Sequence, residues 1–79
     1  MDFYIGESQD NGIGLLSRFT GTLLGAKRAA TRAQMWQGTE LRIEDDLRRI
    51  IARKQWRSKW ENTHLAYDMG LCKTHHFQG

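Results

Sequence analysis

The side chains best suited to metal or nucleophilic chemistry lie near the end of this 79-residue chain. Cys72 is followed by His75 and His76, and His64 lies upstream. One thiolate and three imidazoles are ligands that Zn²⁺ accepts in groups of four. The spacing is unlike that of a zinc finger, because Cys72 has no cysteine partner and adjacent histidines do not easily face one ion. We therefore expect no metal site, no cofactor and a flexible tail over residues 70–79.

Catalysis is not expected either. A cysteine with a histidine nearby can form a thiol nucleophile, but Cys72 lies so near the end of the sequence that a rigid pocket is hard to build around it. The acidic residues at 40–46 lie beside arginines with which they can pair, and Gly12-x-Gly14 lacks the lysine of a phosphate-binding loop. The sequence therefore favours a non-enzymatic protein.

Charge is distributed unevenly along the chain. Residues 1–17 carry a net charge of −3, residues 18–59 carry +7 and residues 60–79 carry −1, which together give the total of +3. We expect residues 1–12 to form an acidic arm or loop, with a short strand or extended segment at its start. The basic middle segment is the part that would attract a polyanion.

The apolar spacing predicts an all-α fold built on an antiparallel helical hairpin. Over residues 13–37 the positions Leu16, Phe19 and Leu23 recur with a helical period, although Gly21 and Gly25 can interrupt the helix. Over residues 39–62 a threonine and several acids precede a run of arginines and lysines, which is the charge order that a helix dipole favours. Gly38 between the two segments is typical of a helix end.

Two helices bury only one face each, so the core must be closed by further chain. We expect a short third helical segment running to about Met69, with Gly70 as its stop. The N-terminal arm or a second copy of the chain are the alternatives. A single small domain over residues 1–79, with a homodimer as one form, follows from this length, because cores of this size are marginal alone.

On the second predicted helix, arginines and tryptophans share the side opposite the aliphatic stripe. Arginine and tryptophan are enriched where proteins bind proteins, and they also suit phosphate contact and base stacking. The alternative is that the tryptophans belong to the core and are covered by the end of the chain. The residues of this predicted partner-binding face are Arg42, Arg49, Arg53, Trp56 and Trp60.

Two functions remain after these exclusions. The first is a helical docking module, an adaptor or inhibitor that binds a larger protein or protein–nucleic acid complex. The alternative is a dimeric protein that binds DNA or RNA directly through segment 18–59. The candidate nucleic-acid residues are Arg18, Lys27, Arg28, Arg32, Arg57 and Lys59. Membrane binding is not expected beside an acidic N-terminus, and a single cysteine favours the cytoplasm.

Overall fold

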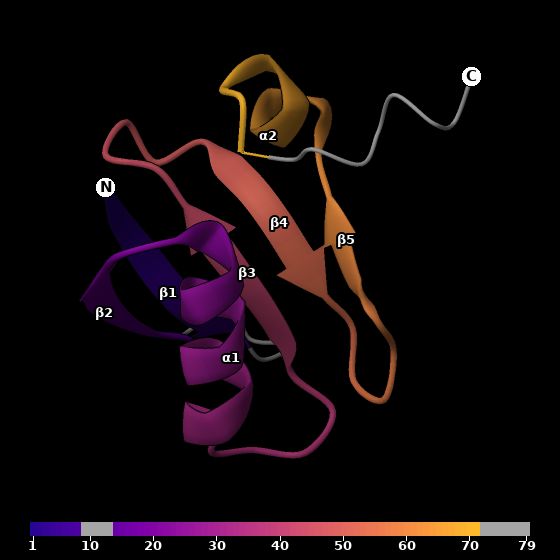
Figure 1. The fold of residues 1–79 in the computed structure, drawn as a ribbon. Coiled ribbons are helices and arrows are strands. Elements are labelled where there is room, and N and C mark those ends of the chain that lie inside the picture. Colours follow the sequence, from indigo (N-terminus) through magenta and orange to yellow (C-terminus); the bar gives the residue numbers. More distant parts are fainter. Residues whose placement is uncertain (9–13, 72–79) are drawn as a thin grey trace.

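The computed structural model describes residues 1–8 and 14–71 and shows a five-stranded antiparallel sheet with two short helices on one face (Figure 1). The strand order in the sheet is β2-β1-β3-β4-β5, so β1 lies inside the sheet and β2 and β5 form its edges. The elements are β1 (Asp2–Ser8), β2 (Gly14–Thr20), α1 (Leu23–Ala33), β3 (Glu40–Glu44), β4 (Ile50–Lys54), β5 (Trp60–Asn62) and α2 (His64–Asp68).

The predicted all-α helical hairpin is wrong, and the segment 13–37 shows the first reason. Its first part is strand β2, which pairs along its length with β1, and the helix begins only at Leu23. Gly21 separates the two with a φ of 150°, and the Thr22 hydroxyl then caps α1 by accepting a hydrogen bond from the Gly25 N–H. The break considered at Gly21 is therefore real, whereas Gly25 is helical.

The second predicted helix, over 39–62, is three strands. Leu41 and Ile43 are buried while Arg42 lies on the other face, which is the two-residue alternation of a strand. Arg48 and Arg57 take left-handed φ values of 64° and 63° in the connections that follow β3 and β4. A helix cannot continue through such residues, because right-handed helices need a negative φ at every position.

The charge pattern that resembled a helix instead stabilises a turn. The Asp45 carboxylate accepts hydrogen bonds from the Leu47 and Arg49 N–H groups and from the Arg49 Nε, the last at 2.8 Å. Asp45 is fully buried and lies at the end of β3. Two opposite charges four residues apart, a spacing that also suits a helix, therefore close the connection between β3 and β4.

The described residues near the two ends of the chain form a strand and a short helix. Residues 2–8, which were expected to belong to an acidic arm, form a strand with a partner on each side. The expected third helical segment corresponds to α2, after which Gly70 has a φ of 74° and Leu71 packs against the core. The rest of the predicted tail, with Cys72, His75 and His76, lies outside the described residues.

One apolar cluster joins both helices to the same face of the sheet. α1 packs on β1, β2 and β3, and α2 packs on β4 and β5, as Figure 1 shows. The buried members of the cluster are Phe3, Leu23, Ala26, Ile43, Ile51, Ala52 and Ala66. The opposite face of the sheet carries no helix in the described part of the chain.

At Gly25, α1 lies close to the Phe19 side chain of β2. A Cβ at this position would lie 2.9 Å from the Phe19 Cζ and 3.2 Å from the Thr22 Oγ1. We expect Gly25→Ala to lower the free energy of unfolding by about 1–3 kcal/mol, although alanine favours a helix by roughly 1 kcal/mol over glycine. Urea unfolding measures the difference, and Phe19→Leu should reduce the penalty. A stabilising Gly25→Ala would contradict this close contact.

Two buried carboxylates should make stability depend on acid. Burial alone would raise the pKa of Glu7, but hydrogen bonds from the Met35 N–H, the Thr39 hydroxyl and the Trp36 N–H outweigh it and hold the pKa below the ordinary 4.5. Burial likewise opposes ionisation of Asp45, yet the N–H groups and charge of Arg49 hold its pKa below the ordinary 3.8.

At pH values above the ordinary pKa of each group, both carboxylates are ionised and stabilise the fold. This stabilisation is lost as the pH falls toward the lower pKa values of the folded protein. We expect Glu7→Gln to cost about 1.5–3 kcal/mol at neutral pH, since it removes a charged acceptor from three donors. Urea midpoints between neutral and acid pH should then vary less in Glu7→Gln and in Asp45→Asn than in the parent. Asp46→Asn, at an exposed position, is the control. An unchanged pH profile in both variants would refute the assignment.

Candidate functional site: a basic groove between α1 and β5

A groove of about 520 Å³ lies between the outer side of α1 and the start of β5. We call it the α1–β5 groove. Its volume falls within the range of about 300–1,000 Å³ that is typical of ligand sites, and it is open to solvent along its length. The lining residues are Leu24, Lys27, Arg28, Thr31 and Arg32 from α1 and Trp60 from β5.

The position of α1 on the sheet decides which of its side chains reach the groove. Leu23, Ala26 and Ala30 are buried beneath the helix. Residues one position further along lie about 100° around the helix, so Leu24, Lys27 and Thr31 follow one another along its flank. The small alanines let the helix lie close to the sheet, and long basic side chains on its flank then border the groove.

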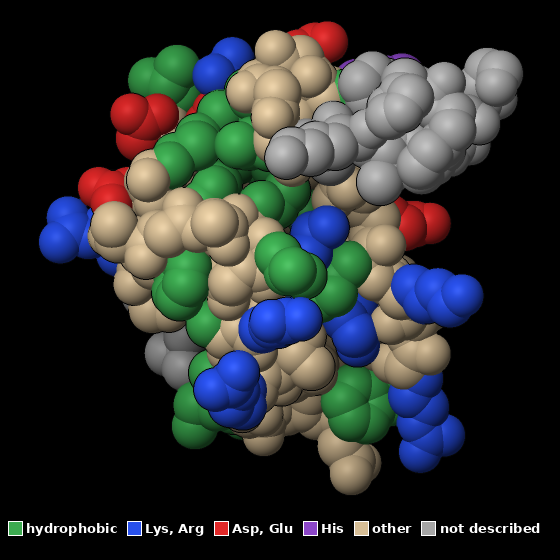
Figure 2. All heavy atoms as spheres, viewed as in Figure 1, with side chains coloured by type: hydrophobic (Ala, Val, Ile, Leu, Met, Phe, Trp, Pro, Cys, Tyr) green, Lys and Arg blue, Asp and Glu red, His purple; other side chains and the backbone are tan. Residues whose placement is uncertain are grey.

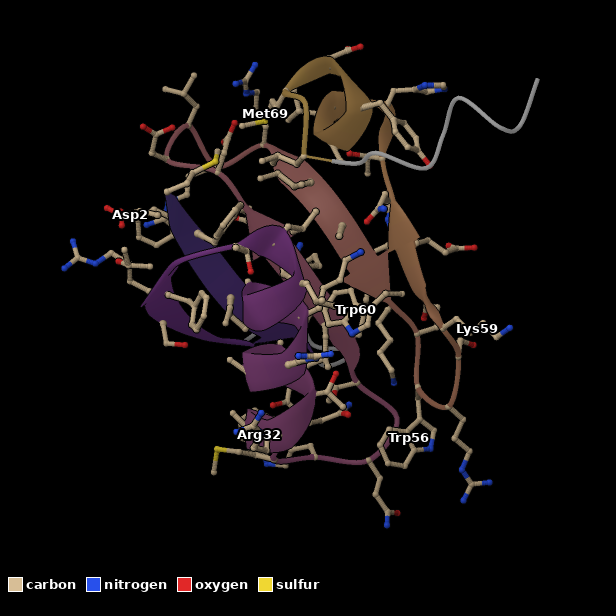
Figure 3. The ribbon with its side chains drawn as sticks, in the orientation of Figure 1. Asp2, Arg32, Trp56, Lys59, Trp60 and Met69 are labelled. Carbon is tan, nitrogen blue, oxygen red and sulfur yellow. The ribbon has the colours of Figure 1, made fainter. Side chains whose placement is uncertain are left out.

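Trp60 forms the β5 wall of the groove. It packs against the core cluster and lies opposite Lys54 in the β4–β5 pairing. Its indole N–H donates a hydrogen bond of 3.1 Å to the Thr31 Oγ1, and the Thr31 hydroxyl in turn donates to the Lys27 carbonyl oxygen at 2.9 Å. Figure 3 shows Trp60 between α1 and the β4–β5 hairpin. The ring is therefore held to the helix by its polar end and to the core by its apolar body.

The groove is positively charged. Three of its six lining residues are lysine or arginine, and among the described residues that line it none is acidic. Lys54 projects to the same face of the sheet as its cross-strand partner Trp60. Figure 2 shows Lys and Arg side chains gathered over α1 and around the β4–β5 turn on this side. An anion is consequently the ligand charge that the groove favours.

The opposite face of the sheet differs, because its charges are interleaved. Arg53 lies 3.9 Å from Glu40 and is paired across the strands with Glu61. Arg42 donates a hydrogen bond to the Ser8 hydroxyl. Arg48 stacks over the Tyr4 ring, with its Cζ 4.8 Å from the ring centroid. This face has no comparable excess of positive charge over acidic partners.

The predicted partner-binding residues do not form one surface. Arg42 and Arg53 lie on the helix-free face, Arg49 is held by Asp45, and Trp60 lies in the α1–β5 groove. Trp56 lies in the turn between β4 and β5 (Figure 3). These five residues would share one side only if 39–62 were a helix. In the strands and turns that this segment forms, they lie on different faces of the sheet.

The predicted nucleic-acid residues are brought together in part. Lys27, Arg28 and Arg32 share the groove with Trp60. Two more of these predicted residues lie in the turn that leads into Trp60. The first is Arg57, whose Cζ is 5.9 Å from the Trp56 ring centroid. The second is Lys59, whereas Arg18 lies on β2 opposite Tyr4 and so on the helix-free face.

Sequence reasoning missed two groove residues, Leu24 and Thr31. The predicted helix begins ten residues before α1, and Leu24 was not assigned to its exposed side. In the structure Leu24 is 57% exposed. Thr31 follows Lys27 by four residues, which is the spacing of a hydroxyl that bonds back to a helical carbonyl. Its role toward Trp60 depends on tertiary structure and left no signal in the sequence.

Other kinds of site are not seen in the described part of the chain. Residues 1–8 and 14–71 contain no group of three His, Cys, Asp or Glu side chains arranged to hold a metal ion. No helix within these ranges is long and apolar enough to cross a membrane. Comparison of the chain with family models, curated proteins and solved structures finds no match.

Anion attraction by the groove can be measured on Trp60 itself. In a Trp36→Phe, Trp56→Phe variant Trp60 is the single tryptophan. With each quenching constant divided by that of free N-acetyltryptophanamide at the same ionic strength, we expect a larger value for iodide than for caesium. A surface potential of about 1 kT raises the local anion concentration roughly threefold, and added inert salt should remove the difference.

The control compares two charge-matched pairs in that background. Arg28→Ser with Arg32→Ser should abolish the preference for iodide, while Arg18→Ser with Arg53→Ser should leave it unchanged. Equal effects of the two pairs would show that only the net charge matters, which would contradict a localised basic groove.

Proposed function

We propose that this protein binds nucleic acid through the α1–β5 groove. The observation that carries the proposal is the convergence of Lys27, Arg28 and Arg32 with the Trp60 indole in one groove whose described lining has no acidic side chain. Phosphate contacts by lysine and arginine supply most of the affinity of such proteins, and aromatic rings add base stacking.

The same groove is less suited to an acidic protein partner. Cations alone would serve an acidic peptide, but a rigid tryptophan among them fits a ligand that carries flat rings as well as negative charge. Docking on a larger protein, the other function expected from the sequence, rested on a face that the fold divides between two sides of the sheet. An acidic peptide is therefore kept as an outcome of the test.

The groove predicts a modest affinity with a defined salt dependence. If Lys27, Arg28 and Arg32 each neutralise one phosphate, three counterions are displaced from a single strand, and log K falls with log salt with a slope of roughly −2.

We expect fluorescence anisotropy with a labelled oligonucleotide to show binding at about 50 mM salt that weakens roughly 20-fold at about 200 mM, as a slope of about −2 requires. Arg28→Ser with Arg32→Ser should weaken binding and bring the slope close to −0.7. Arg18→Ser with Arg53→Ser removes the same charge from the other face and should leave the slope unchanged.

Three results would contradict the proposal. They are absence of oligonucleotide binding at the lower salt, an equal loss in the two charge-matched pairs, and binding of polyglutamate as tight as that of the oligonucleotide at equal ionic strength. The last result would favour an acidic protein partner instead.

A further inference from the structure

We infer that the α1–β5 groove takes a single strand, with one base stacked on the face of Trp60 and the neighbouring phosphates against α1. This inference rests on the proposed function and specifies its ligand. It follows from how Trp60 is held, from how deep it lies and from where the cations lie relative to it.

The first step is the orientation of the indole. The only hydrogen-bond donor of a tryptophan side chain is its N–H, and in Trp60 that group already donates to Thr31. No polar group of Trp60 is left to read a base edge. What the ring offers the groove is its flat surface, which stacks on any base, so we expect little dependence on sequence.

The second step is the partial burial of the ring. Trp60 is partly buried, packs on the core with one part and lines the groove with another. In a duplex each base is stacked between its neighbours and paired at its edge, and its flat face is not available without unstacking, which costs a few kcal/mol. A base of a single strand enters the groove without that cost. A duplex would keep only the phosphate contacts of α1.

The third step is the spacing between the cations and the ring. Arg28 and Arg32 lie four residues apart on α1, a rise of about 6 Å along the helix axis, and Trp60 is tied to Thr31 between them. A base on Trp60 therefore lies in the same groove as two arginines of α1 that can contact the neighbouring phosphates. The turn 55–59 leads out of the Trp60 end and carries Arg57 and Lys59, which extends the basic track beyond the groove.

The test uses the full chain with three labelled probes, which are oligo(dT) of about 12 nucleotides, the same strand paired with oligo(dA), and inorganic polyphosphate. We expect the single strand to bind more tightly than the duplex. Trp60→Ala should weaken single-strand binding roughly 5- to 150-fold, the range that corresponds to the loss of one stacked base. It should leave duplex and polyphosphate binding almost unchanged. Trp60→Phe should retain most of the affinity.

Trp56→Ala is the matched control, because Trp56 belongs to the same hairpin but does not line the groove. Should Trp60→Ala fail to fold, the Trp36→Phe, Trp56→Phe variant gives an independent readout. Its Trp60 emission should be quenched by oligo(dT) and not by polyphosphate, since only the oligonucleotide brings a base to the ring.

Equal binding of single strand and duplex, with Trp60 emission unchanged by oligo(dT), would overturn the single-strand inference while leaving nucleic-acid binding intact. A loss in Trp56→Ala as large as that in Trp60→Ala would also overturn the assignment to Trp60. If none of the nucleic acids binds, the proposed function fails together with the inference.

Discussion

The arrangement of this protein depends on one buried carboxylate, that of Glu7. It lies in β1, inside the sheet, and accepts hydrogen bonds from the Met35 N–H at 2.9 Å, the Trp36 N–H at 2.8 Å and the Thr39 hydroxyl at 2.8 Å. These donors belong to the segment that leaves α1 and enters β3. At the other end of α1, the Gly21 N–H donates to the Met1 carbonyl oxygen. The segments at both ends of α1 are thus joined to β1 or to the residue before it, which fixes the direction in which the helix crosses the sheet.

That course creates the groove. Close packing of Gly25 on Phe19 brings α1 over β1, β2 and β3, while α2 covers β4 from the other end. The surface between α1 and β5 is covered by neither helix in the described chain, and the first residue of β5 occupies it. A tryptophan there shields the core from water, and its bond to Thr31 fixes the distance between strand and helix. The proposed ligand site and the edge of the core are therefore the same surface.

Some of this could be read from the sequence, and the failures have a common cause. The distribution of charge, the helix end at Gly70 and the basic residues Lys27, Arg28 and Arg32 could be predicted from the order of residues alone.

The strands β3 to β5 could not be predicted in this way, because acids before arginines at four-residue spacing suit both a helix and the turn that Asp45 closes. Ile43, Ile50 and Ile51 favoured strands, yet their spacing also fits a helical stripe. Pairing between distant segments decided the outcome, and no local pattern records which segments pair. The groove was hidden for the same reason, since its two walls come from α1 and β5.

The two faces of the sheet treat charge in opposite ways, and this bears on function. On the helix-free face Arg53 has Glu40 and Glu61 as neighbours, so its charge is compensated within the fold. On the helix side Arg28 and Arg32 are like charges four residues apart, an arrangement that costs an isolated helix about 0.2–0.5 kcal/mol, and no acidic side chain lines the groove among the described residues. An acidic residue at an exposed position such as 24 would reduce this repulsion and stabilise the helix. The protein has Leu24 there, which places apolar surface beside the cations. A polyanion with flat, partly apolar bases satisfies both features at once, because its phosphates relieve the repulsion and its rings cover the apolar surface of Leu24 and Trp60.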